Sequence, residues 1–368
     1  MRKDRCITYD TTAATVAAGE AYATMTSQVL TSVITATPFR VSFFGGGTDF
    51  PGYFNRRGGL VLATSVQQYS YVALNSLPRL LEKRFRISYS QLEMVSRIDE
   101  IRHDICRATL GEYEALLEDH FVDIHSYADL PTGTGVGSSS AFAVGLVQAL
   151  HALCGVYLPP KDLARKAILI EREKLGDVGG WQDQVASAYG GFNLVRFREN
   201  DFEVFPLGIA GGLRETIEAS CWLYFTAMRR SSSAVQQVSF SPANMVDKAK
   251  VLDQTRELAE EALVVLREAT DPLAAMRRWG ALLHEAWALK RSLSSSVSLP
   301  EIDKLYEKAR QAGAWGGKII GAGGGGFLLV IAPPDRRAAI DAAVGNLHSF
   351  PVRLEQNGSH IVYVNEKV

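Results

Sequence analysis

The residues most suited to chemistry form a glycine- and serine-rich string, PTGTGVGSSS, at positions 131–140. Three glycines at alternate positions let the backbone turn tightly and bring several N–H groups towards one ligand. Apolar residues at helical spacing follow, so the string ends at a helix start, where anions are favoured. Serine hydroxyls there can cap the helix, contact phosphate or help to ligate Mg²⁺. The string predicts a phosphate-binding loop; a capped helix after a plain turn is the alternative.

This string differs from the two commonest phosphate motifs. A P-loop requires G-x-x-x-x-G-K-[ST], which the sequence lacks. In the dinucleotide fingerprint G-x-G-x-x-G the third glycine would fall on Ser138. The loop therefore belongs to neither of these classes.

Two acidic residues downstream could take part in phosphate chemistry. Asp183 stands at a helix start, where a carboxylate often only stabilises the helix dipole. Beside a bound phosphate donor it could instead accept a proton from a substrate hydroxyl. Glu171 reads either as part of a solvated helix face or as a ligand of Mg²⁺. The residue pattern leaves these alternatives open.

Two more glycine strings, GGGTDF from Gly45 and GAGGGG from Gly321, are too rich in glycine for regular strand or helix. Turns alone would explain one or two glycines in each. Close approach of the backbone to a ligand explains a whole string better.

The elements that must position these residues change in character along the 368-residue chain. Residues 1–32 are expected to form a flexible extension. Residues 33–210 mix strands with helices, and we expect an antiparallel meander in which the runs from Leu60 and Tyr69 are separate strands. A helix from Ser138 to Cys154 should have one buried face. Residues 211–368 contain long amphipathic helices, so the prediction is an α+β fold in two domains.

Composition excludes several classes of protein. The 39 Lys+Arg against 40 Asp+Glu give no global positive field for nucleic acid or anionic lipid. The four cysteines form no C-x-x-C pair, which disfavours a zinc or redox motif and favours reduced thiols in the cytoplasm. No apolar run approaches the length of a membrane span, and the N-terminus lacks the apolar core of a secretory signal.

Taken together, three motifs in a fixed order resemble the GHMP sugar-kinase superfamily. They are TPFRVSFFGGGTDFPGYF, PTGTGVGSSSA and KIIGAGGGGF. Two further strings, IEREKLGDVGGWQDQVASAYGGFN and LHEAWALKRSLSSSVS, are most similar to the heptose 7-phosphate kinase branch. The resemblance covers nearly the whole chain from about Thr35 to Tyr363.

The resemblance implies a fold and a set of site residues. The fold would be the two-domain GHMP kinase fold, with an N-terminal domain like ribosomal protein S5 domain 2, a ferredoxin-like C-terminal domain and the site between them. Asp183 would be the catalytic aspartate, and Arg40 would help to neutralise charge beside it. Ser139 and Glu171 would hold Mg²⁺. The implied ATP-binding residues are Gly133, Thr134, Gly135, Val136, Gly137, Ser138 and Ser139. The implied substrate-binding residues are Gly45, Gly46, Gly47, Thr48, Asp49, Arg230, Gly324 and Gly325.

The implied reaction is transfer of the ATP γ-phosphoryl group to the anomeric C1 hydroxyl of D-glycero-D-manno-heptose 7-phosphate. The 1,7-bisphosphate product would serve nucleotide-activated heptose biosynthesis for capsule, S-layer or lipopolysaccharide. Alternatives are a kinase of L-fucose, glucuronate or galactose, a related decarboxylase, or a non-catalytic sugar and nucleotide sensor. Gly46 and Gly47 stand where galactokinases have Glu and His, which argues against a galactose-type contact set.

A sugar phosphate also needs cationic partners. Arg229 with Arg230, Lys290 with Arg291, and Lys318 are the candidates, although paired basic residues usually lie on solvated faces. The expected partners are thus ATP and a small sugar phosphate, with neither nucleic acid nor membrane. The oligomeric state stays open, a homodimer included.

Overall fold

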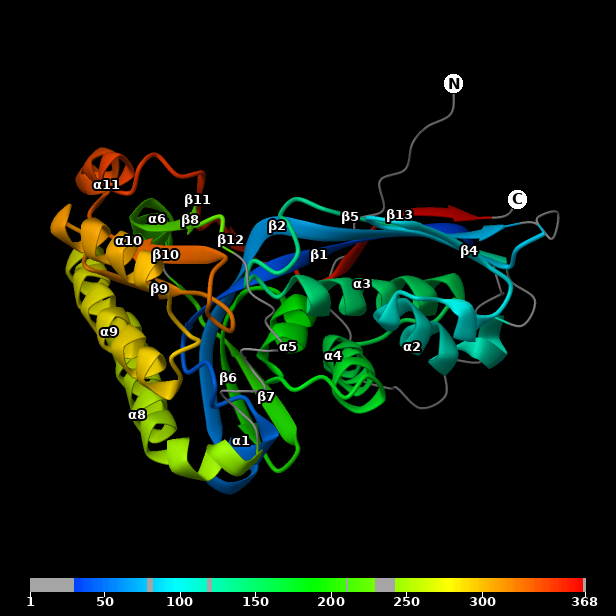
Figure 1. Cartoon of the computed structure of the whole chain (residues 1–368), viewed down its shortest axis with the longest axis horizontal. Helices are drawn as coiled ribbons and strands as arrows, with labels where there is room; N and C mark the ends of the chain where they lie inside the picture. Colours follow the sequence, from blue (N-terminus) through cyan, green and yellow to red (C-terminus); the bar gives the residue numbers. More distant parts are fainter. Residues whose placement is uncertain (1–29, 78–81, 118–120, 210, 229–241, 367–368) are drawn as a thin grey trace.

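The structure, a computed structural model, describes residues 30–77, 82–117, 121–209, 211–228 and 242–366. Two sheets with helices packed on them make up this part of the chain, which confirms the predicted α+β class (Figure 1). The predicted extension, residues 1–32, lies outside the described residues as far as position 29, and residues 30–32 already belong to the first strand. Arg229 and Arg230 also lie outside the described residues.

The larger sheet has the strand order β13-β1-β2-β5-β3-β4, with β6 and β12 also paired to β2 and β7 paired to β6. β5 lies between β2 and β3, and it runs antiparallel to β2 but parallel to β3. The predicted simple meander is therefore wrong. The strands are β1 (Leu30–Phe44), β2 (Gly59–Leu77), β3 (Phe85–Ser88), β4 (Leu92–Val95), β5 (Phe121–Ala128), β6 (Phe192–Arg198), β7 (Asp201–Pro206), β12 (Leu354–Glu355) and β13 (His360–Glu366).

The runs from Leu60 and Tyr69 form one strand, β2, where the sequence pattern predicted two. A register shift opposite Pro38 and Phe39 leaves two extra residues of β2 between Val66 and Tyr69. Such a bulge bends a strand without ending it. The part of β2 before the bulge pairs with β6, and the part after it pairs with β5. One strand therefore serves both ends of the sheet.

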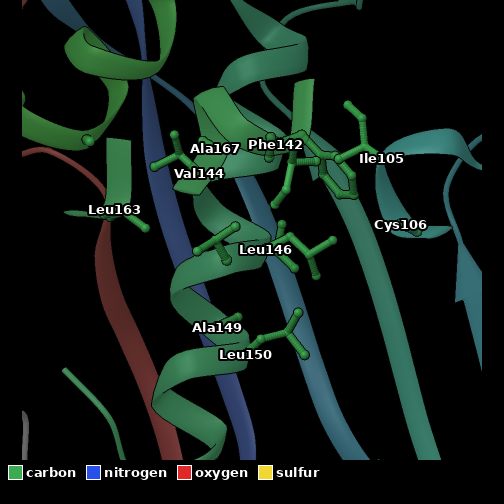
Figure 2. Close-up of a cluster of buried hydrophobic side chains, with 14 of the residues drawn as sticks. Ile105, Cys106, Phe142, Val144, Leu146, Ala149, Leu150, Leu163 and Ala167 are labelled. Carbon is green, nitrogen blue, oxygen red and sulfur yellow. The ribbon is translucent and has the colours of Figure 1, made fainter. Parts of the chain in front are cut away.

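Helices cover one face of this sheet, and α3 is the most deeply buried of them (Figure 1). The sequence predicted one buried face for it, but most of its residues are buried all round. In Figure 2, Leu146 and Leu150 of α3 lie in the same cluster as Ile105 of α2 and Leu163 of α4. The helices on this side, with α1 at the lower end, are α1 (Pro51–Arg57), α2 (Asp104–Glu112), α3 (Ser138–Leu153), α4 (Pro160–Ile168) and α5 (Gln182–Tyr189).

The second sheet has the order β11-β8-β10-β9 and carries the long helices α8 and α9 beside it (Figure 1). Asp271 caps α9, accepting from the N–H groups of Leu273 and Ala274. The strands are β8 (Cys221–Phe225), β9 (Gly316–Ile319), β10 (Phe327–Ile331) and β11 (Ser349–Pro351). The helices are α6 (Gly211–Ser220), α8 (Pro242–Arg267), α9 (Pro272–Leu293), α10 (Pro300–Gln311) and α11 (Arg337–Ala343).

The two sheets share a hydrophobic core. The ring of Phe43 on β1 lies 4.6 Å from that of Trp279 on α9, centroid to centroid, and both side chains are fully buried. The chain also returns to the first sheet at its end, where β13 pairs with β1. Division of the chain at residue 210 stays a prediction, and two strands after that residue, β12 and β13, pair with strands of the first part. Within the described ranges, no helix has the length and apolar character needed to cross a bilayer.

The packing of α3 on β1 gives a stability prediction based on two helical glycines. A Cβ at Gly145 would lie 2.7 Å from the buried Thr37 Oγ1, which also contacts Ser359 Oγ. Gly145→Ala should therefore lower the free energy of unfolding by roughly 1–3 kcal/mol, despite the higher helix propensity of alanine. Urea denaturation measures this change.

Gly111 on α2 is the matched control, because a Cβ there meets no atom within 4 Å. Gly111→Ala should raise the free energy of unfolding by about 0.5–1 kcal/mol. Equal effects of the two substitutions would show that the close contact of α3 with β1 does not govern stability at Gly145.

Candidate active site

The two predicted catalytic residues, Arg40 and Asp183, form an ion pair. Arg40 Nε and Nη2 each donate to one carboxylate oxygen of Asp183, both at 2.7 Å. Arg40 Nη1 donates to the carbonyl oxygen of Gly135. The Arg40 side chain is 3% exposed, whereas the Asp183 side chain is 21% exposed. This two-pronged geometry fixes the carboxylate and leaves it open to solvent on one side.

The glycine-rich loop at residues 131–137 lies directly beside this ion pair. Gly133, Gly135 and Gly137 have φ angles of +74°, +85° and +77°, which side chains rarely allow. A Cβ at Gly137 would lie 3.3 Å from Asp183 Oδ2. Gly137 is the N-cap of α3, and no side chain caps that helix. Its first N–H groups, those of Ser138 and the residues after it, have no partner within the helix, and a helix start of this kind favours an anion.

The third glycine string packs against this loop. A Cβ at Gly135 would lie 2.5 Å from the Ile320 carbonyl oxygen, and one at Gly321 would lie 2.5 Å from Gly135 Cα. The N–H of Phe327 donates to the carbonyl oxygen of Thr134 at 3.2 Å. Glycine is thus required where the two backbones meet, as the sequence analysis expected of a close approach, although here the approach is to another loop.

Ser139 and Glu171 also lie together, as the resemblance implied. Ser139 Oγ donates to Glu171 Oε1 at 2.9 Å, and Gln184 Nε2 donates to Glu171 Oε2 at 2.5 Å. Glu171 is buried, so the alternative of a solvated helix face is wrong. It projects from a π-helical stretch, Leu169–Lys174, a feature often found at functional sites. Gln184 received no role from the sequence, because its contact depends on how two neighbouring helical segments pack against each other.

The donors at Glu171 fit Mg²⁺. The Ser139 hydroxyl stands at the start of α3, where phosphate would bind, and the Glu171 carboxylate lies beside it, so both offer oxygen ligands. The described residues include no group of three or more His, Cys, Asp or Glu that could hold a metal by itself. Mg²⁺ bound with nucleotide needs only one or two carboxylates, because phosphates and water complete its shell.

Asp49 is completely buried, and both its oxygens bind backbone. Oδ1 accepts from the N–H of Gly47 at 2.9 Å, and Oδ2 accepts from the N–H of Gln182 at 3.1 Å. Burial raises the pKa of this carboxyl, and the Asp183 charge adds to the rise, although the two N–H groups oppose it. A Cβ at Gly180 would overlap the Asp49 carboxylate. Asp49 thus joins the first glycine string to the start of α5.

The other predicted substrate residues have distinct surroundings. Gly45 and Gly47 have positive φ angles, whereas a Cβ at Gly46 would make ordinary contacts, 3.5 Å from Ser42 Oγ. Thr48 Oγ1 donates to the carbonyl oxygen of Gly45 at 2.7 Å. Gly324 and Gly325 are buried, and the N–H of Gly324 donates to the Val297 carbonyl oxygen. Their contact with a sugar stays a prediction.

The predicted cations divide into two groups. Lys290 Nζ donates to the carbonyl oxygens of Ile319 at 2.9 Å and Gly321 at 2.6 Å, and Lys318 Nζ donates to that of Phe43 at 2.6 Å. Both lysines therefore bind backbone carbonyl oxygens, and both lie close enough to Arg40 to be affected by its charge. Arg291 instead pairs with Asp303 at 3.2 Å. A role for any of them in binding a sugar phosphate stays a prediction.

Comparison with known proteins agrees with this geometry. The GHMP kinases N terminal domain matches residues 103–191, and the GHMP kinases C terminal domain matches residues 270–347. The chain is 29% identical over 309 residues to D-glycero-alpha-D-manno-heptose 7-phosphate kinase of Campylobacter jejuni, covering 79% of this chain and 87% of that protein. It is 25% identical to a bifunctional fucokinase/GDP-fucose pyrophosphorylase of Arabidopsis thaliana over 78% of this chain and 28% of that protein.

The fold is shared with a solved structure, a D-glycero-D-manno-heptose 1-phosphate kinase of Bacteroides thetaiotaomicron. The TM-score is 0.69 at 24% identity, and the match covers 89% of this chain and 98% of that chain. The two domain matches, the curated relatives and the fold all agree. The chain therefore belongs to the GHMP kinase superfamily, and it is an ATP-binding phosphotransferase that acts on an alcohol group.

Proposed function

We propose that this sugar kinase phosphorylates the anomeric C1 hydroxyl of D-glycero-D-manno-heptose 7-phosphate, with ATP as donor and the 1,7-bisphosphate as product. The observation that carries the choice of sugar is the 29% identity to a heptose 7-phosphate kinase across 79% of this chain. A second candidate acceptor is L-fucose, favoured by the 25% identity to a fucokinase. The heptose-like strings of the sequence and the higher identity support heptose 7-phosphate.

Asp183 is assigned the role of orienting the acceptor hydroxyl and taking its proton. The C1 oxygen attacks the γ-phosphorus, the bond from that phosphorus to the β–γ bridging oxygen breaks, and ADP leaves. The hydroxyl proton passes to the Asp183 carboxylate. Phosphoryl transfer depends mainly on positioning and charge stabilisation, so a carboxylate held rigidly by Arg40 suits this role.

Arg40 and the loop at residues 133–139 are assigned to the phosphates. The uncapped start of α3 offers N–H groups to the phosphate oxygens, and Arg40 adds a fixed positive charge beside Asp183. The contact of Arg40 with the Gly135 carbonyl oxygen couples the acid to the loop. Donor and acceptor would therefore meet at the Asp183 carboxylate.

Ser139 and Glu171 are assigned to Mg²⁺. Mg²⁺ bound there would neutralise charge on the nucleotide phosphates. Gln184 would hold the Glu171 carboxylate in place from its other oxygen, as outer hydrogen-bond partners of metal ligands do.

The choice of acceptor is tested by an ADP-release screen of heptose 7-phosphate, L-fucose, glucuronate, galactose and a no-sugar blank. We expect the highest kcat/KM with heptose 7-phosphate, and phosphorus NMR should place the new phosphate on C1. Preference for L-fucose would replace the proposed acceptor. Binding of both ligands without ADP release would support a sensor.

Replacing Asp183 tests its role in proton transfer. Asp183→Asn keeps the shape of the side chain but cannot accept the proton, so kcat should fall by about 10²-fold or more. Asp177→Asn is the control, because Asp177 is exposed in the same segment and should leave kcat unchanged. A folded Asp183→Asn enzyme with a near-native rate would rule out the assigned role.

Replacing Glu171 tests the metal assignment. Glu171→Gln keeps the side-chain volume, and the Mg²⁺ concentration for half-maximal rate should rise by at least about 10-fold, the loss seen even for outer-shell partners. Calorimetry of ADP binding with and without Mg²⁺ should show the same weakened coupling. Glu173→Gln, an exposed change two residues away, is the control. An unchanged Mg²⁺ requirement in Glu171→Gln would remove Glu171 as a ligand.

A further inference from the structure

Lys290 occupies a position that phosphoryl transfer, as described above, does not yet use. It lies in the last turn of α9, and its ammonium group donates to the carbonyl oxygens of Ile319 and Gly321. These two carbonyls flank the point where β9 runs into the third glycine string. The lysine therefore fixes the start of that loop from a long and well-packed helix.

A continuous set of contacts connects Lys290 to the catalytic acid. Gly321, which binds Lys290, packs against Gly135 so closely that neither position has room for a Cβ. The Gly135 carbonyl oxygen accepts from Arg40, and Arg40 holds Asp183. A shift of the Gly321 backbone would consequently displace the phosphate loop and, through Arg40, the carboxylate of Asp183.

The charges around Lys290 also connect it to the phosphate site. Burial, with repulsion from Arg40, lowers the pKa of Lys290 to about 7. Burial lowers the pKa of Lys318 well below its ordinary value, and repulsion from Lys290 and Arg40 adds to this. The described hydrogen bonds of both lysines go to carbonyl oxygens, and Asp183 is paired with Arg40. A bound polyanion would relieve this repulsion between like charges.

The charged groups around Lys290 come from several elements. Arg40 lies on β1, Lys318 on β9 and Asp183 on α5, whereas Arg291 of α9 is engaged with Asp303 of α10. Of these, Arg40 and Lys318 are the charges that act on Lys290 or are acted on by it. Each of the two adds positive charge where the loops meet.

We propose that Lys290 is a positioning residue for the terminal phosphate of ATP, acting through the Gly321 loop and through its own positive charge. The proposal rests on ATP binding at the loop of residues 133–139 but not on the identity of the sugar. Loss of Lys290 should therefore affect the binding of ATP more than that of ADP. The terminal phosphate, which ADP lacks, is the group that would reach the Arg40–Asp183 pair, where transfer takes place.

The test compares binding of a non-hydrolysable ATP analogue and of ADP, by calorimetry without sugar. Lys290→Met should weaken analogue binding by at least about 10-fold, as expected when a charged partner of phosphate is lost. ADP binding should change by less than about 3-fold, and Lys290→Arg should restore part of the analogue affinity. Lys304→Met, which removes an exposed lysine from α10, should change neither affinity.

Proton uptake gives a second measurement on the unchanged protein. At pH 8 the Lys290 amine is largely neutral, and an added anion should recharge it, so analogue binding should take up protons more than ADP binding does. Calorimetry in buffers of different ionisation enthalpy measures this difference, which should disappear in Lys290→Arg.

The outcomes that would overturn the proposal are specific. Equal weakening of analogue and ADP binding in Lys290→Met would show a general structural role. Unchanged affinities with equal proton uptake would show that Lys290 takes no part in binding the terminal phosphate. If Lys290→Met does not fold, Lys290→Arg and the proton measurement still decide. Because neither measurement contains a sugar, a wrong acceptor in the proposed function would leave these results unchanged.

Discussion

The buried guanidinium of Arg40 is the interaction on which the rest of the site depends. A cation that is 3% exposed requires close, well-aligned partners, because removal of one of them would leave an uncompensated buried charge. Its partners come from residues 135 and 183, far from it in sequence, and they approach from the phosphate loop and from the first turn of α5. The need to satisfy one side chain thus sets the distance between the catalytic acid and the phosphate-binding backbone.

Glycines at the contact between two loops are the second requirement of the site. The loops at Gly135 and Gly321 touch through their backbones, and the shared core around Phe43 and Trp279 holds the two sheets behind them. A side chain at either glycine would separate the loops. The glycine strings therefore allow two backbones to approach each other closely, as well as allowing backbone to approach a ligand. The positions of the site residues depend on the packed core behind them.

The sequence indicated which loops and acids lie near one another, but it did not predict how the surrounding elements pack. Local signals were sufficient to predict the glycine-rich loop before α3, because turn chemistry depends on neighbouring residues. The single buried face of α3 was wrong, since periodicity cannot show that helices cover the side opposite the sheet. The two strands expected around Tyr69 proved to be one, because a bulge bends β2 where the pattern indicated a break. Glu171 is buried and accepts from Gln184, a contact that only the tertiary fold creates.

The two aspartates of the site show how environment separates roles that sequence leaves equal. Asp49 has no exposed surface, and each of its oxygens accepts a backbone N–H, so its carboxylate holds the first glycine string against α5, and its predicted contact with a sugar stays a prediction. Asp183 is held by an arginine on one side and is 21% exposed, so a substrate hydroxyl can still reach it. Burial raises the pKa of Asp49, and the nearby charge of Asp183 makes a smaller contribution in the same direction. In a chain with a formal net charge of −1, local cations and oriented backbone N–H groups must then supply the positive potential that a phosphate donor needs.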